Sequence, residues 1–139
     1  MPTKVLYRTQ ATATGGRDGK ASTTDGTFQV NLSTPKELGG GGGAGNNPEQ
    51  LFALGWSSCF GQAVLLLAKK HGLDGQAARV GCKVELDKDE TSFALKAELT
   101  LSIPGADKTK LQALIEEAHQ ICPYSKATRN NIPVTLTVA

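Results

Sequence analysis

NNPEQLFALGWSSCFGQAVLLLAKKHG, residues 46–72, reads as one long helix that is apolar on all of its faces. Asn47 is a suitable N-cap, Pro48 fits the first helical position, and Glu49 favours the positive end of the helix dipole. Three basic side chains and a glycine that can adopt a left-handed cap mark its end: Lys69, Lys70, His71 and Gly72. A helix that is apolar all round must be covered on every side. In a chain of 139 residues, one sheet can cover only one side of it.

Segments in which apolar and polar residues alternate predict strands on both sides of this helix. Before the helix, extended segments with glycine-rich turn signals predict an antiparallel hairpin or meander: residues 3–14, 20–24 and 28–32. After the helix, the pattern predicts two strands at residues 80–87 and 93–103. A second helix at residues 107–121, which Pro123 ends, is followed by a polar turn or short helix at 124–131 and a closing strand at 134–138. The order βββ-α-ββ-α-β predicts an α+β fold of antiparallel sheets and segregated helices.

Length and composition predict a single soluble domain that spans residues 1–139. The formal charge is +2, and it comes from scattered lysines and arginines, so the sequence offers no basic patch for nucleic acid. The N-terminus has no apolar stretch of signal-peptide length, and the longest apolar run, residues 63–68, is too short to cross a membrane. We therefore expect a cytoplasmic protein with neither a membrane nor a nucleic-acid partner.

The glycine-rich run at residues 39–45 precedes the long helix. Regular structure in such a run would carry a large entropic cost, and the Gly-Lys-Ser/Thr ending of a phosphate-binding loop is absent from it. The run is therefore predicted to be a mobile loop that leads into the helix.

Three cysteines, odd in number and widely spaced, do not form the paired framework of a small secreted domain. We expect reduced thiols. Cys82 alternates with valines on a predicted strand and is expected to be packed and inert. Cys59 lies in an apolar stripe of the long helix, where either a core cysteine or a reactive one fits. Cys122 ends the second helix, where a core residue and a redox residue are both compatible with the pattern.

The two histidines leave one catalytic alternative open. His71 is predicted to be a cation at the end of the long helix. His119 precedes Cys122 by three residues, so the two could form a Cys-His nucleophile pair, although a surface histidine fits the pattern as well. No Cys-x-x-Cys or comparable ligand pair occurs, and we expect no metal site and no cofactor.

Three segments together resemble the organic hydroperoxide resistance branch of the OsmC-like family: GGRDGK (15–20), NPEQLFALGWSSCF (47–60) and ICPYSKATRNNI (121–132). The resemblance extends over nearly the whole chain. It implies an intertwined homodimer of α+β fold that reduces organic hydroperoxides with thiols. It also implies a dithiol reductant, dihydrolipoamide either free or on a lipoylated protein.

The same resemblance assigns roles to four residues. Cys59 is the expected peroxidatic thiol and Cys122 the expected resolving thiol. Arg17 is expected to activate the thiolate, and Glu49 to hold that arginine. Chemistry is compatible with these roles, because a thiol buried among apolar side chains has a raised pKa and needs a cation to ionise it. An arginine suits this task, since its forked donors can hold a thiolate, a carboxylate and a peroxide oxygen together.

Apolar side chains around Cys59 are expected to bind the substrate tail: Leu51, Phe52, Trp56 and Phe60. Such contacts favour bulky alkyl or fatty-acid hydroperoxides over hydrogen peroxide.

One distance suggests why two subunits are needed. Glu49 and Cys59 are ten residues apart, which is about 15 Å along an unbroken helix and too far for one arginine to touch both. If the long helices of two subunits pack antiparallel about a two-fold axis, Glu49 of one chain can meet Cys59 of the other. The second subunit would also cover the exposed side of the apolar helix.

Two other classes of function compete with the peroxidase. One is a non-catalytic protein of the same fold that binds a lipid-like ligand or senses oxidants. The other is a hydrolase built on Cys122 and His119, although no Asp or Asn is evident to orient the histidine.

Overall fold

The computed structural model describes residues 4–139, and its internal contacts divide the chain after Pro48 into an N-terminal unit and a helical unit. The order of the main elements is the predicted one, with three strands, a long helix, two strands, a second helix and a last strand. A short third helix lies where a polar turn or short helix was expected. The predicted α+β class is confirmed.

The N-terminal unit is a three-stranded antiparallel sheet in the order β1-β2-β3. Its strands are β1 (Ala11–Thr14), β2 (Lys20–Thr23) and β3 (Gln29–Asn31). The first strand is shorter than the predicted 3–14: residues 4–10 form no strand, and residue 3 lies outside the described part of the chain. Short 3-10 turns occupy Gly16–Asp18 (η1) and Lys36–Leu38 (η2), and residues 39–45 form the predicted loop.

The helical unit begins with α1 (Pro48–Leu67), which is followed by the 3-10 turns η3 (Lys69–His71) and η4 (Gly75–Ala77). The predicted left-handed cap is present at Gly72, with φ of 70°, although it closes η3 rather than α1. Next come β4 (Arg79–Lys88) and β5 (Phe93–Ser102), which pair antiparallel. The chain ends with α2 (Lys108–Ile121), α3 (Pro123–Thr128) and β6 (Val134–Val138).

The last strand differs from the antiparallel arrangement that the alternating pattern suggested. β6 pairs with β5 in parallel, and Ala97 lies opposite Val134 while Leu101 lies opposite Val138. Parallel neighbours need a long crossover connection, and here α2 and α3 supply it. Alternation shows which side of a strand is buried but says nothing of the strand's direction.

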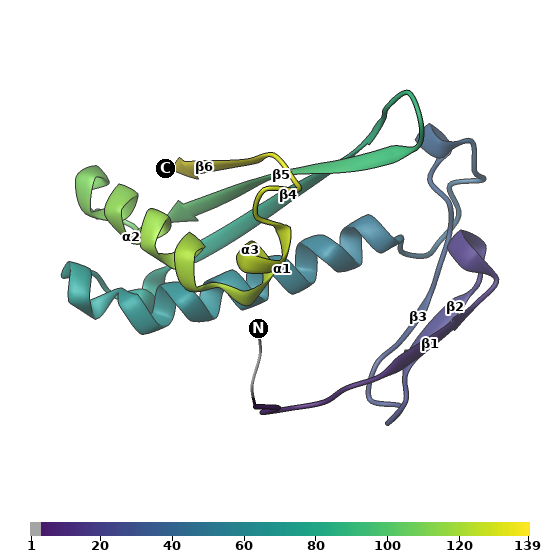
Figure 1. Ribbon diagram of the computed structural model, residues 1–139, viewed down its shortest axis with the longest axis horizontal. Helices are drawn as coiled ribbons and strands as arrows, with labels where there is room; N and C mark the ends of the chain where they lie inside the picture. Colours follow the sequence, from purple (N-terminus) through teal and green to yellow (C-terminus); the bar gives the residue numbers. More distant parts are fainter. Residues whose placement is uncertain (1–3) are drawn as a thin grey trace. The chain divides into compact units, whose positions relative to one another are not determined.

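The core of the helical unit lies between the sheet β4-β5-β6 and the helices α1 and α2 on one of its faces (Figure 1). α2 contributes an apolar stripe to this core, and its members are wholly buried: Leu111, Leu114, Ile115 and Ala118. Asp107 caps the start of α2, because its Oδ1 accepts a hydrogen bond from the Lys110 amide at 3.0 Å. The crossover thereby brings the end of α2, and Cys122, against the middle of α1.

α1 is 20 residues long with a mean hydropathy of 1.4, enough by length and composition to cross a membrane. Its four buried residues nevertheless belong to the core of the helical unit: Trp56, Phe60, Ala63 and Val64. α1 is therefore a core helix. Other apolar residues of α1 remain exposed in the single chain, namely Leu54 (59%), Leu65 (40%) and Leu66 (67%).

Candidate active site

Cys122 lies at the junction of two helices and is fixed by both. Its amide donates to the Ala118 carbonyl at 2.9 Å and so ends α2, and its own carbonyl accepts from the Lys126 amide at 2.9 Å and so begins α3. Pro123 takes the first position of α3, where the missing N–H of proline costs no helical hydrogen bond. The side chain of Cys122 is wholly buried.

Cys59 and Cys122 are in contact although 63 residues separate them in the sequence. Their Sγ atoms are 3.6 Å apart, and both thiols are free. A disulfide requires about 2.05 Å between the sulfurs, so the bond can form after a shift of about 1.5 Å. The fold therefore brings together two thiols that can be interconverted with a disulfide.

The surroundings of Cys59 in the helical unit disfavour its thiolate overall. Burial raises the pKa of Cys59 above its ordinary value, the backbone N–H of Tyr124 opposes this by donating to the sulfur, and the adjacent Cys122 thiol raises it again. Tyr124 is the second residue of α3, where a backbone N–H has no partner within the helix. Cys59 thus accepts a hydrogen bond from the start of α3, although desolvation remains the largest effect.

An aromatic cluster lies beside the thiols. The Phe52 ring is edge-on to Trp56 at 5.6 Å and to Tyr124 at 6.5 Å between centroids. Tyr124 lies directly on Gly55, since a Cβ at position 55 would be 3.0 Å from the phenol oxygen. A side chain at position 55, one helical turn before Cys59, would require the ring to shift by a few tenths of an ångström.

The four side chains expected to bind the substrate differ in their exposure. Leu51 and Phe52 are half-buried, whereas Trp56 and Phe60 have no exposed surface at all. In the single chain, Trp56 and Phe60 are therefore core residues behind the cysteine pair rather than lining residues. Phe52 and Tyr124 present the accessible aromatic surface.

His119 is partly exposed, and the contacts described for it are with residues other than Cys122. It is half-buried, its Nδ1 lies 2.8 Å from the Oγ of Ser125, and the Phe60 ring lies at 6.5 Å. Burial, and secondarily the charge of Arg129, lower the pKa of His119. Nothing in these contacts supports a Cys122-His119 hydrolase.

Arg17 lies in the glycine-flanked turn that was expected, between β1 and β2 of the N-terminal unit. Gly19 closes this turn, because a Cβ there would fall 1.7 Å from the Thr14 carbonyl oxygen. Asp18 anchors it by accepting a hydrogen bond from the Thr34 amide at 2.9 Å. The backbone that carries Arg17 is therefore well defined within its own unit.

Glu49 lies in the first turn of α1, as expected. The helix is unbroken from Pro48 to Leu67, so Glu49 and Cys59 of one chain are separated by about 15 Å along its axis. One chain cannot bring this carboxylate to its own thiol.

Cys82 lies on the core-facing side of β4 and is half-buried against the hydrophobic core. Burial raises its pKa to about 11. This fits the inert, packed thiol that the strand pattern predicted.

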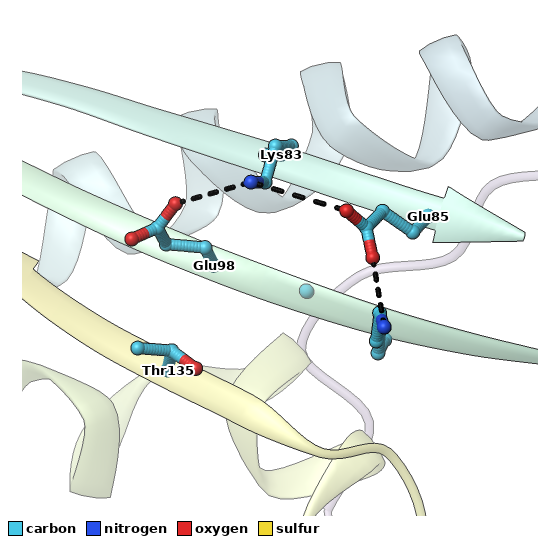
Figure 2. A pocket seen from close by; sticks show the side chains of 6 residues that line it. Lys83, Glu85, Glu98 and Thr135 are labelled. Carbon is cyan, nitrogen blue, oxygen red and sulfur yellow. Dashed lines mark ion pairs between the residues drawn. The ribbon is translucent and has the colours of Figure 1, made fainter.

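The other face of the same sheet carries a polar hollow of about 290 Å³, shown in Figure 2. Lys83 lies 3.9 Å from Glu85 and 3.6 Å from Glu98, and Lys96 lies 3.1 Å from Glu85. Exposed pairs of this kind are worth little energetically. Residues next to Lys83 along β4, such as Cys82, point to the opposite, apolar face, so the hollow is separate from the thiol pair.

Comparison with known proteins places these features in a family. Residues 40–137 match the family described as OsmC-like protein. The organic hydroperoxide resistance protein of Xanthomonas axonopodis pv. citri is 49% identical over 140 residues, with 99% of this chain and 98% of that protein covered. Organic hydroperoxide resistance protein OhrB of Bacillus subtilis is 40% identical, with 94% of this chain and 96% of that protein covered.

Solved structures give the same result for the fold. An organic hydroperoxide resistance protein from Legionella pneumophila superimposes with a TM-score of 0.89 at 40% identity, covering 98% of this chain and 99% of that one. The crystal structure of OhrB of Bacillus subtilis gives a TM-score of 0.86 at 37% identity, covering 97% and 100%. The likeness thus covers both units of the chain.

Proposed function

The chain belongs to the OsmC-like family, whose relatives here are organic hydroperoxide resistance proteins, and from this membership and the thiol pair we propose that it is a Cys-based peroxidase for organic hydroperoxides. The observation that carries the proposal is the 3.6 Å separation of the Cys59 and Cys122 sulfurs. Two reduced thiols at this distance can store the two electrons that peroxide reduction requires.

The reaction proceeds in three steps. The Cys59 thiolate attacks the hydroxyl oxygen of the hydroperoxide, the O–O bond breaks, and the alkoxide takes up a proton and leaves as the alcohol. The resulting sulfenic acid then reacts with the Cys122 thiol, forming the S–S bond and releasing water. A dithiol such as dihydrolipoamide, free or on a lipoylated protein, reduces the disulfide and restores both thiols.

Arg17 and Glu49 supply the remaining electrostatics in this proposal. Burial raises the pKa of Cys59, so a permanent cation is needed to make the thiolate available at neutral pH. We assign this role to Arg17, with Glu49 orienting its guanidinium. The family resemblance supports this assignment.

A homodimer completes the site. The 15 Å separation along α1, about ten residues at 1.5 Å each, favours Glu49 of one subunit acting at Cys59 of the other. The exposed leucines of α1 also call for a cover, which the partner's α1 would provide. We place this homodimer in the cytoplasm, where thiols stay reduced.

The substrate tail rests on Leu51, Phe52 and the ring of Tyr124, with Trp56 and Phe60 supporting that surface from the core. These apolar contacts favour alkyl and fatty-acid hydroperoxides over hydrogen peroxide. Comparable kcat/KM values for cumene hydroperoxide and hydrogen peroxide would contradict this preference.

The decisive experiment follows consumption of tert-butyl hydroperoxide with dihydrolipoamide as the electron donor. Wild type is expected to turn over. Cys59→Ser should be inactive, Cys122→Ser should stop after one equivalent of peroxide, and Arg17→Ala should be severely impaired. Turnover by Cys59→Ser, or no turnover of wild type with any dithiol, would overturn the proposal in favour of ligand binding or oxidant sensing.

A further inference from the structure

Three helices of the helical unit meet at one buried hydroxyl, that of Ser125. Its Oγ lies 3.3 Å from Nε1 of Trp56 on α1 and 2.8 Å from Nδ1 of His119 on α2, while Ser125 itself belongs to α3. Ser125 has no exposed surface. We refer to Trp56, Ser125 and His119 as the hydroxyl hub.

The direction of one hydrogen bond in the hub follows from its chemistry. An indole N–H can only donate, so Ser125 accepts from Trp56. The hydroxyl keeps a second lone pair and its own proton, so either tautomer of a neutral His119 can bond to it: Ser125 donates where Nδ1 is bare and accepts where Nδ1 carries the proton. The lowered pKa of the half-buried His119 agrees with this neutral form.

A further hydrogen bond, from Arg129, connects the end of α3 to His119 of the hub. Nη2 of Arg129, the residue after α3, donates to the backbone carbonyl of His119 at 2.6 Å. α3 is thus attached to α2 by Ser125 at its beginning and by Arg129 at its end. Two attachments therefore fix the position of this short helix on α2.

The hub lies one helical turn from each sulfur. Trp56 precedes Cys59 by three residues on α1, and Ser125 follows Cys122 by three residues. Trp56 and Cys59 lie on the same side of α1, and Cys122 directly precedes α3, so a bond between Trp56 and Ser125 constrains the distance between the two cysteines.

We propose that Ser125 is a positioning residue whose hydroxyl, through Trp56 and His119, holds Cys122 close enough to Cys59 for rapid disulfide closure. Closure forms the S–S bond, breaks the S–O bond of the Cys59 sulfenic acid, and releases its hydroxyl with the Cys122 proton as water. The sulfurs must approach from 3.6 Å to about 2.05 Å for this step. A misplacement of about 1 Å in such a geometry can slow a reaction roughly a hundredfold.

The test separates closure from the first oxidation. Fully reduced full-length protein is mixed with one equivalent of cumene hydroperoxide, quenched with N-ethylmaleimide at increasing times, and analysed by mass spectrometry for sulfenic acid (trapped with dimedone) and disulfide. In Ser125→Ala we expect sulfenic acid to form at a rate within about threefold of wild type and the disulfide to form at least roughly tenfold more slowly. Further oxidation of Cys59 to the sulfinic acid should increase, because the sulfenic acid persists.

Two comparisons distinguish positioning from a general loss of stability. Thr128→Val removes another buried hydroxyl of α3, one that donates to the Tyr124 and Ser125 carbonyls. At a thermal stability equal to that of Ser125→Ala, Thr128→Val should leave the closure rate unchanged. His119→Asn offers an amide that can accept from Ser125 or donate to it in place of Nδ1, and it should restore closure relative to His119→Leu. Trp56→Phe tests the other arm of the hub if Ser125→Ala does not fold, and should slow closure likewise.

The inference rests on the proposed function only for the oxidant, and diamide removes that dependence because it oxidises a dithiol without peroxide. If wild type closes with diamide but forms no sulfenic acid with cumene hydroperoxide, the peroxidase proposal fails and the hub can still be measured. If Ser125→Ala closes as fast as wild type with both oxidants, or Thr128→Val slows closure equally, the positioning role of Ser125 is wrong.

Discussion

The ring of Tyr124 lies so close to Gly55 that a Cβ at position 55 would be 3.0 Å from the phenol oxygen and 3.1 Å from Cε2. Tyr124 therefore touches α1 at two successive turns, with its ring on Gly55 and its amide on Cys59. Glycine inside a helix costs about 1 kcal/mol relative to alanine. The space that the Tyr124 ring occupies explains why position 55 is a glycine despite this cost.

Gly55→Ala should impair the reaction more than it impairs the fold. The added methyl group forces the Tyr124 ring to shift by a few tenths of an ångström, beside the backbone amide that donates to Cys59. We expect kcat/KM for cumene hydroperoxide to fall roughly tenfold, since small misplacements near reacting groups have large effects on rate. Steady-state kinetics and a thermal melt of the same preparation measure the two effects.

Gly61→Ala is the matched control. It lies in the same helix, and a Cβ there would meet nothing within 4 Å. Alanine should raise the free energy of unfolding of the single chain by about 0.5–1 kcal/mol. Because Gly61 lies on the same side of α1 as the exposed Leu54 and Leu65, kcat/KM should be unchanged for protein whose oligomeric state matches wild type. An equal loss of activity in both variants would show that helix rigidity, rather than the Tyr124 contact, limits the reaction.

Cys82 should be dispensable and slow to react. Burial raises its pKa to about 11, so alkylation by iodoacetamide should remain slow at pH 8 and accelerate as the pH approaches that value. Cys82→Ala should keep peroxidase turnover and lower the free energy of unfolding by about 1 kcal/mol. Peptide mapping after timed alkylation gives the rate at each cysteine, and a Cys82 that reacts faster than Cys59 at pH 8 would contradict this prediction.

The alternating patterns contain enough information to predict most of the fold. The buried stripe of α2 and the two long strands follow directly from the spacing of apolar residues, because that spacing reflects which side faces the core. The parallel pairing of β6 does not follow, since it depends on how the crossover through α2 and α3 returns the chain to the sheet. Local pattern cannot encode that path.

Less of the candidate site than of the fold could be predicted from the sequence. Nothing in the spacing of Cys59 and Cys122 places their sulfurs 3.6 Å apart, and only the resemblance of the surrounding motifs suggested the pair. The partners of His119 were missed because a histidine on an amphipathic helix reads as exposed, whereas its ring turns toward Ser125 of the next helix. Tyr124 was missed because its role depends on an absent side chain, that of Gly55.

Glu117 should contribute to stability in a pH-dependent way. Its carboxylate lies 2.8 Å from Nζ of Lys70 and 3.2 Å from Nε2 of His71, and hydrogen bonds from these two groups lower its pKa. A carboxyl with a lowered pKa in the folded state stabilises the fold above its unfolded pKa of about 4.3, and this contribution disappears as the pH falls through the folded value.

Glu117→Gln should therefore lower the thermal midpoint slightly at pH 7, and its difference from wild type should shrink as the pH falls below about 4. Thermal melts at a series of pH values measure this difference. Glu116→Gln serves as the control, because Glu116 contacts only the neutral amide of Gln112, at 3.0 Å, among the contacts described for it. A difference that persists unchanged at low pH would show that the Glu117 side chain acts by packing and not by charge.

His119 should make stability depend on pH in the range where enzymes work. Burial and the charge of Arg129 lower the pKa of His119, so between that folded value and about 6.5 the unfolded chain binds a proton that the folded chain does not. Stability linked to His119 is therefore complete above about 6.5 and decreases as the pH falls through this window. Urea unfolding at pH 7.5 and 5.5 should show a smaller decrease for His119→Asn than for wild type. An equal decrease in the two proteins would show that His119 binds a proton as readily in the folded chain as in the unfolded chain, which would contradict its lowered pKa.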